Sequence, residues 1–110
     1  MKTLVSAAAL AFALAPAASA QTAPVDDCGP IQGTIRVADD APITPDMARV
    51  SADDARATAV RALPGAIVTD VDLEEEDGFL VYEVDLWRDE TEFEVVVDAG
   101  TGEALCTERD

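Results

Sequence analysis

The chain has 110 residues, of which 23 are Asp or Glu and 7 are Lys or Arg, so its formal net charge is −16. This excess of negative charge disfavours binding to nucleic acid or to anionic lipid, because both depend on basic side chains that face phosphate. Basic or cationic partners are favoured instead. The chain also contains no histidine and only two cysteines, which excludes imidazole-based catalytic triads and the usual zinc sites.

Residues 1–20 have the pattern of a secretory signal peptide. Lys2 precedes an apolar run from Leu4 to Ala15, and Ala18-Ser19-Ala20 provides the small residues of a cleavage site. We therefore expect cleavage between Ala20 and Gln21 and an exported product, periplasmic or secreted. The apolar run is shorter than the ~20 residues of a membrane span, so no membrane insertion is expected.

Residues 21–49 are rich in Pro, Asp, Gly and Thr, and they are expected to form a partly irregular N-terminal arm. Thr34 to Val37 is a candidate short strand, and Thr44-Pro45 is typical of the start of a helical turn. Cys28 in this arm and Cys106 form an even pair, which in an exported protein predicts a disulfide. In the chain-entropy model, closing so long a loop stabilises the fold by roughly 4.5 kcal/mol.

A short helix is predicted from Ser51 to Leu63. Ser51 is a good N-cap, and Asp54 three residues later completes a capping box. Pro64-Gly65 ends the helix. Helical spacing places a stripe of mostly small apolar residues on one side of this helix, which allows close approach to a sheet. The stripe comprises Ala52, Ala55, Ala59, Ala62 and Leu63.

After Pro64 the apolar period changes to two, which predicts antiparallel strands. Asp77-Gly78 is typical of a type I′ hairpin, and a second tight connection is expected near Asp89-Glu90. The predicted fold is therefore α+β, with one helix packed on a three- to four-stranded antiparallel meander. The side chains expected to face the helix are Ile67, Thr69, Val71, Leu73, Leu80, Tyr82, Val84, Leu86, Phe93, Val95 and Val97. Tyr82 is interpreted as a core residue with a satisfied hydroxyl.

Four sequence segments occur in a recognisable order: A-R-V-S-x-D-D-A at the helix start, A-L-P-G at its end, L-V-Y-E-V in the middle strand and V-V-D-A-x-T-G-E-A-L near the end. This order resembles the PepSY domain, over residues 50–106, with residues 107–110 left as a C-terminal tail. One departure is the second hairpin, which often contains Asp-Gly in relatives and is Asp89-Glu90 here. The resemblance implies an α+β domain found in propeptides of thermolysin-like secreted metallopeptidases and in small exported proteins. It implies no catalytic residues, and it suggests a role in inhibiting or chaperoning peptidases.

The same alternation places a row of acidic residues on the sheet face away from the helix. Like charges directly opposed across strands are destabilising by a few tenths of a kcal/mol per pair, so this row requires an explanation. The pairs expected from the hairpin register are Asp72 with Glu83, Asp70 with Asp85, Asp85 with Glu94, and Val68 with Trp87.

Several interpretations of this acidic face are open. It is a solvated surface, an adaptation to high salt, or a site for a basic or extended partner. The candidate partner contacts are Asp70, Asp72, Glu83, Asp85, Trp87 and Glu94, with Val68, Val81 and Val96 as apolar contacts. Trp87 is alternatively covered by the arm. For a divalent cation the candidate ligands are Asp70, Asp85 and Glu94, with weak and nonspecific binding expected.

The sequence therefore predicts a non-catalytic exported binding or modulatory module with a protein or peptide partner. By resemblance, that partner is a secreted peptidase and the module is an inhibitor or chaperone-like regulator. The alternative is an acidic envelope protein that binds calcium or another divalent cation. No enzymatic activity and no cofactor are expected, because a domain of this size lacks the usual acid–base, nucleophilic and phosphate-binding motifs.

Overall fold

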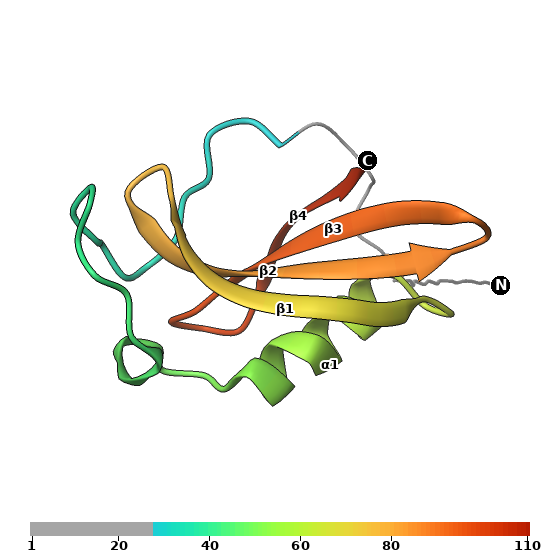
Figure 1. Ribbon diagram of the computed structural model, residues 1–110, viewed down its shortest axis with the longest axis horizontal. Helices are drawn as coiled ribbons and strands as arrows, with labels where there is room; N and C mark the ends of the chain where they lie inside the picture. The colour runs from blue at the N-terminus through green and yellow to red at the C-terminus, as the bar shows by residue number, and fades with distance from the viewer. Residues whose placement is uncertain (1–27) are drawn as a thin grey trace, which may run out of the picture.

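The computed structural model describes residues 28–110, so the predicted signal peptide and residues 21–27 of the arm lie outside the described residues. Within them, a four-stranded antiparallel sheet in the order β1-β2-β3-β4 packs one face against helix α1 (Figure 1). The elements are η2 (Pro45–Met47), α1 (Ala52–Ala62), β1 (Ile67–Glu76), β2 (Phe79–Arg88), β3 (Thr91–Asp98) and β4 (Ala104–Arg109). The α+β prediction is confirmed, with four strands in the meander.

Helix α1 begins at the predicted capping box. The Asp54 N–H donates to Ser51 Oγ at 3.1 Å, and the Ser51 N–H donates to the Asp54 carboxylate at 3.2 Å. The helix buries Ala55, Ala59 and Ala62, as expected, but Ala52 is exposed and Thr58 takes its place in the buried stripe. The prediction for Ala52 was wrong, and this residue is the first of the helix. The buried Thr58 hydroxyl donates to the Gly102 carbonyl at 2.7 Å, which joins this side of α1 to the β3–β4 turn.

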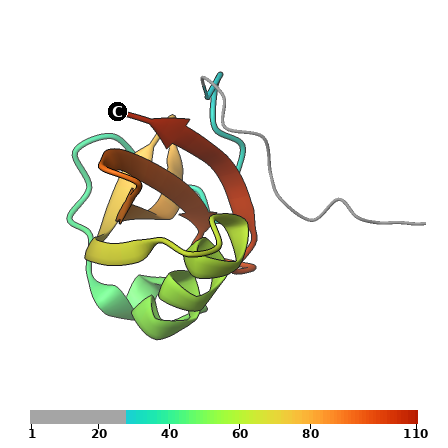
Figure 2. The ribbon, with the colours of Figure 1, turned by 90° about the vertical axis from the view of Figure 1, so that its right-hand side faces the viewer.

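The face of the sheet under α1 forms the main core, and Figure 2 shows the helix lying along this one side. The predicted inward residues of β2 and β3 are buried: Leu80, Tyr82, Val84, Leu86, Phe93, Val95 and Val97. Tyr82 donates its hydroxyl to the Val50 carbonyl at 2.8 Å, which satisfies its one polar group as predicted.

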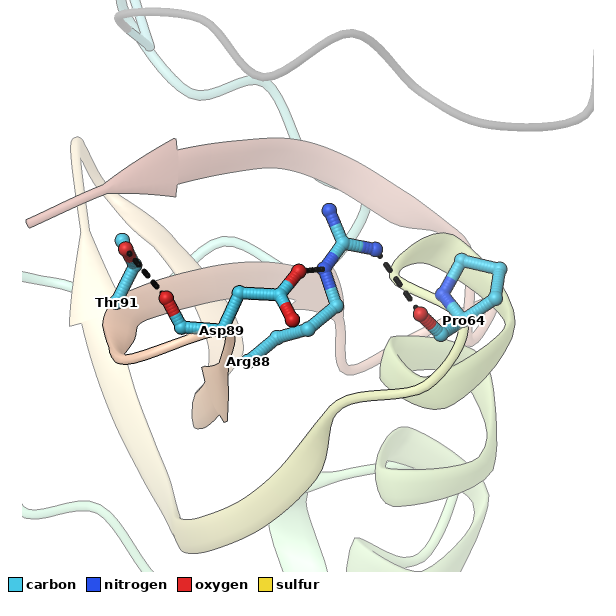
Figure 3. A network of polar contacts seen from close by, with 4 residues as sticks. All are labelled: Pro64, Arg88, Asp89 and Thr91. Carbon is cyan, nitrogen blue, oxygen red and sulfur yellow. Dashed lines mark hydrogen bonds and ion pairs between the residues drawn. The ribbon is translucent and has the colours of Figure 1, made fainter.

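Both hairpins are tight two-residue turns. Asp77 and Gly78 have φ values of 53° and 89°, and Asp89 and Glu90 have values of 52° and 62°, as type I′ turns require. The second turn lacks glycine, and Arg88 before it is tied to the connection between α1 and β1. Arg88 donates from Nη1 to the carbonyl of Pro64 at 2.9 Å, while its Nε lies 3.9 Å from the Asp89 carboxylate (Figure 3). A cation beyond the last turn of a helix is also favourably placed relative to the helix dipole.

A β-bulge interrupts the pairing of β1 with β2. The predicted pairs of Asp70 with Asp85 and Asp72 with Glu83 are confirmed, but the register shifts between Val68 and Asp70. Val68 consequently opposes Leu86 and packs against the core, whereas Ile67 opposes Trp87 and is 65% exposed. The predictions that Ile67 and Thr69 face inward, and that Val68 faces outward opposite Trp87, were wrong because a bulge moves every residue before it to the other face.

The N-terminal arm covers part of the face opposite α1. Ile31 packs on Val81 and Val96, which are 0% and 1% exposed, and Cys28, Leu105 and Cys106 border this second, smaller core. The predicted Cys28–Cys106 disulfide is present, with a Cα–Cα distance of 5.8 Å. The prediction that Val81 and Val96 offer apolar contacts to a partner was wrong because the arm already buries them.

The rest of the arm follows the edge of the first hairpin. The candidate strand from Thr34 to Val37 is reduced to an isolated bridge between Arg36 and Phe79, and the predicted helical turn after Thr44 is η2. The side chain of Thr34 donates to the buried Asp98 carboxylate, which also accepts from the Gly100 N–H at 2.9 Å. These contacts join the arm to the β3–β4 turn.

The last strand is longer than expected. Thr107 to Arg109, assigned from the sequence to a C-terminal tail, continue β4 and pair with β3. Thr107 is fully buried opposite Val95. The folded unit therefore extends beyond Cys106 to Arg109.

Candidate functional site

The face of the sheet opposite α1, called the outer face here, gathers all six predicted partner contacts. The bulge precedes Asp70, so the register from Asp70 onward keeps the predicted alternation. Asp70, Asp85 and Glu94 form a directly opposed row across β1, β2 and β3, and Glu108 continues this row onto β4. The neighbouring pair of Asp72 and Glu83 lies next to this row. The sequence thus located the acidic row correctly.

The outer face has a closed end and an open end. At the closed end, near the first hairpin, the arm covers Val81 and Val96. At the open end, near the second hairpin, Trp87 is 45% exposed and Ile67 opposes it at 65% exposure. The indole is therefore not covered by the described part of the arm. Glu92 opposes Trp87 on β3, so the exposed apolar pair lies directly beside acidic residues.

Glu83 and Glu76 extend the acidic row along the outer face towards the first hairpin, and they interact with each other. The pKa of Glu76 is raised to about 7, first by a hydrogen bond shared with Glu83, then by burial and by repulsion from Glu83 and other nearby carboxylates. The hydrogen bond with Glu76 lowers the pKa of Glu83, but burial and repulsion from Glu94 and Glu74 outweigh it, and the net shift is upward. Because the contact raises the pKa of Glu76 and lowers that of Glu83, a proton held by this pair is favoured on Glu76.

The other carboxyl groups of this face are shifted in the same direction. Burial, followed by repulsion between neighbours, raises the pKa of Glu94, Asp85 and Glu74, although a hydrogen bond with Glu83 partly offsets the shift at Glu94. The pKa of Asp72 is raised by a hydrogen bond and repulsion from Asp70. A nearby cation would oppose these upward shifts of pKa. Within residues 28–110 the one ion pair is Arg88 with Asp89, in the second hairpin turn.

The predicted cation ligands do not converge tightly on one point. Within residues 28–110, one group has three potential ligand atoms that all lie within 4.8 Å of one another, and it consists of Cys28, Cys106 and Glu108. Its two sulfurs are joined in the disulfide, so they do not provide thiolate ligands. Asp70, Asp85 and Glu94 form no such group, which leaves the cation interpretation without geometric support.

A groove on the inner side of the sheet was not predicted. It has a volume of about 550 Å³ and lies between the segment leading into α1 and the inner side of β1. Its lining comprises Pro45, Ala48, Arg49, Val50, Ser51, Ala52, Val71, Leu73 and Tyr82. The sequence gives no local signal for this groove, because it depends on how η2 is placed relative to β1. The exposure of Ile67 was missed for a similar reason, since it follows from the bulge.

Residues 49–107 match the family model of PepSY, described as the peptidase propeptide and YPEB domain. The chain belongs to the PepSY family. The match covers more than half of the chain and includes α1, β1, β2, β3 and most of β4. PepSY domains are generally non-catalytic propeptide or regulatory modules. Comparisons with curated proteins and with solved structures gave no significant match. In residues 28–110, no helix has both the length and the apolar character that crossing a membrane requires.

Proposed function

We propose that this PepSY domain is an exported, non-catalytic binding module that docks a basic region of a partner protein on its outer face. The observation that best supports the proposal is the open end, where Trp87 and Ile67 are exposed beside Asp85 and Glu92, which form no ion pair within residues 28–110. Trp is enriched among the residues that contribute most to protein–protein binding. A partner with apolar and basic side chains would cover Trp87 and Ile67 and neutralise the neighbouring carboxylates.

The apolar pair favours a protein over a free cation as the occupant. A divalent ion would relieve repulsion among Asp70, Asp85 and Glu94, but it would leave Trp87 and Ile67 in water. A basic protein surface with apolar side chains would both relieve the repulsion among the carboxylates and cover the exposed apolar pair. Bound Lys or Arg side chains would also lower the raised pKa values of the row, so binding should release repulsion that the free domain tolerates.

The proposed class of partner is a secreted peptidase, and the proposed effect is regulation of that peptidase. The family description, which names peptidase propeptides, supports this class. The Cys28–Cys106 disulfide suits an oxidising compartment such as the periplasm or the extracellular medium. A module of this kind regulates by occupying a surface of its partner, so it needs no reactive side chain of its own.

The test is a binding and inhibition assay with the mature chain, residues 21–110, and a panel of secreted thermolysin-like metallopeptidases. We expect Trp87→Ala to weaken both binding and inhibition by about tenfold or more, as loss of a central indole typically does. Val60→Ala is the matched control, because Val60 is 39% exposed but belongs to α1 on the other side of the sheet. Equal affinity of Trp87→Ala and the native domain would contradict docking at the open end. Failure to bind any peptidase of the panel would reject peptidase regulation.

A further inference from the structure

We propose that the free edge of β1, together with the groove beside it, docks an extended peptide segment of a partner. The segment would add a fifth strand to the sheet, with apolar side chains in the groove and basic side chains between them. This site goes beyond the function proposed above. It shares carboxylates of β1 with the outer face, but its hydrogen bonds and apolar contacts come from the edge and inner side of β1 and do not involve Trp87.

The backbone of β1 offers unpaired groups at this edge. The sheet order makes β1 an outermost strand, and the two-residue turn makes Glu76 and Phe79 a hydrogen-bonded pair. Because bonding alternates along an antiparallel pair, Glu74 and Asp72 bond to β2, whereas Val71 and Leu73 direct their N–H and C=O groups outward.

The bonding of Leu80 on β2 confirms this alternation. Its N–H donates to the Ile35 carbonyl at 2.9 Å and its carbonyl accepts from the Ala99 N–H at 3.2 Å, so neither group is directed at its partner Glu75. In the described part of the chain, no backbone hydrogen bond from another segment reaches Val71 or Leu73. A row of unpaired backbone groups of this kind is a template for another strand.

The groove lies beside the same two residues. Val71 and Leu73 line it together with Tyr82, while Ala48 and Val50 provide apolar side chains from the segment before α1. An added strand would place every second side chain on the same face as Val71 and Leu73, and therefore towards the groove. Backbone hydrogen bonds and a pocket for alternate side chains are the two elements of peptide recognition by strand addition.

Charge determines the chemistry of the occupant. The intervening side chains of an added strand would lie on the outer face beside Asp70, Asp72 and Glu74, so Lys or Arg at those positions is favoured. A second copy of this chain is disfavoured, because edge-to-edge pairing of two β1 strands would bring these same carboxylates together in chains of net charge −16.

The probe for this site is a short peptide of alternating Val and Arg with blocked ends, added to the disulfide-bonded mature chain. We expect amide exchange at Val71 and Leu73, followed by NMR, to slow by about tenfold or more as their N–H groups gain partners. The emission of Trp87, the one Trp of the chain, should stay unchanged. A peptide of the same composition with its Val and Arg residues in separate blocks tests whether charge alone is sufficient.

Two further comparisons make the result decisive. The first is methylation of the backbone nitrogens of the peptide, applied either to the valines alone or to the arginines alone. If the peptide adds antiparallel to β1, methylated valines should abolish binding and methylated arginines should not. If it adds parallel to β1, the reverse is expected. Leu73→Ala should weaken binding about tenfold, whereas the control Val60→Ala, at an exposed position of α1 that does not line the groove, should not.

Three results would overturn the proposal. The first is equal binding of the block peptide, which would show a purely electrostatic contact. The second is unchanged exchange at Val71 and Leu73 in the bound state. The third is slow exchange of these amides without any peptide, if the protection increases with protein concentration. This result would identify a second copy of the chain as the occupant. None of these results bears on Trp87, so the two proposals fail separately.

Discussion

The two ends of the outer face differ although the same strands form them. At the closed end, Val81 and Val96 are almost fully buried under Ile31. At the open end, Trp87 and Ile67 remain 45% and 65% exposed. Each end has apolar residues among acidic ones, so the strand pattern alone does not distinguish them. The N-terminal arm, held by Cys28 and by the Ile31 N–H on the Asp77 carboxylate at 2.7 Å, makes the difference.

This comparison shows how an exposed apolar residue on a sheet face should be interpreted. At the closed end, the apolar residues form a second small core and serve stability. At the open end, residues 28–110 leave Trp87 45% exposed, so part of its apolar area is available to a partner. The difference can be tested by uncovering the closed end, by comparing the stability of the two ends, and by titrating the carboxylates between them.

The largest effect is expected from removing the disulfide. Replacement of both cysteines, Cys28→Ser with Cys106→Ser, should lower the free energy of unfolding by up to roughly 4.5 kcal/mol, because the unfolded chain is no longer constrained. Urea unfolding monitored by circular dichroism measures this change. Increased binding of an apolar dye to the folded variant would show that Ile31 has left Val81 and Val96. A loss below about 1 kcal/mol would mean that the rest of the arm is sufficient to hold it in place.

Local signals explain why so much of the fold was predictable. The capping box at Ser51 and the Asp77-Gly78 turn act over a few residues, and each fixes the start or the register of an element. Strict alternation then assigns Tyr82, Val84 and Val95 to the core and Asp85 and Glu94 to the outer face. Predicting the disulfide between the two cysteines required only the expected oxidising compartment and the even number of cysteines.

The errors come from features that depend on the whole structure. The bulge at Thr69 places Val68 inside and Ile67 outside, and no residue type in that stretch marks it. Burial of Val81 and Val96 depends on an arm some fifty residues earlier in the chain, and the groove beside Leu73 depends on where η2 lies. Tertiary contacts of this kind override local pattern, so the open end and the groove were visible only in the structure.

A smaller effect should separate the two ends by stability. Val96→Ala at the closed end should destabilise the domain by about 2 kcal/mol, because it removes buried methyl groups and leaves a cavity beneath Ile31. The matched variant Ile67→Ala at the open end should cost less than about 1 kcal/mol, since its side chain is largely in water. Thermal or urea unfolding measures both. Equal costs would show that the open end contributes as much to folding as the closed one.

The smallest effect concerns the acidic row between the two ends. A raised pKa means that the folded domain binds protons more tightly than the unfolded chain, so its stability decreases as pH rises through the interval between the two values. For Glu76 this interval runs from its ordinary value of 4.5 to about 7. The upward shifts at Glu83, Glu94 and Asp85 act in the same direction. The free energy of unfolding should therefore be higher near pH 5 than near pH 8.

Glu76→Gln assigns this pH dependence to the row. The amide keeps a donor towards Glu83 but has no proton to lose, so the variant should gain a few tenths of a kcal/mol near pH 8 and flatten the dependence of stability on pH. The control is Glu103→Gln, which removes the same charge from an exposed position before β4. Urea midpoints across this pH interval provide the measurement. If the control flattens the curve as much as Glu76→Gln does, net charge rather than the Glu76–Glu83 contact governs the dependence. A basic ligand that reaches the row should have the same stabilising effect at high pH as the substitution, because both remove the repulsion that deprotonation creates.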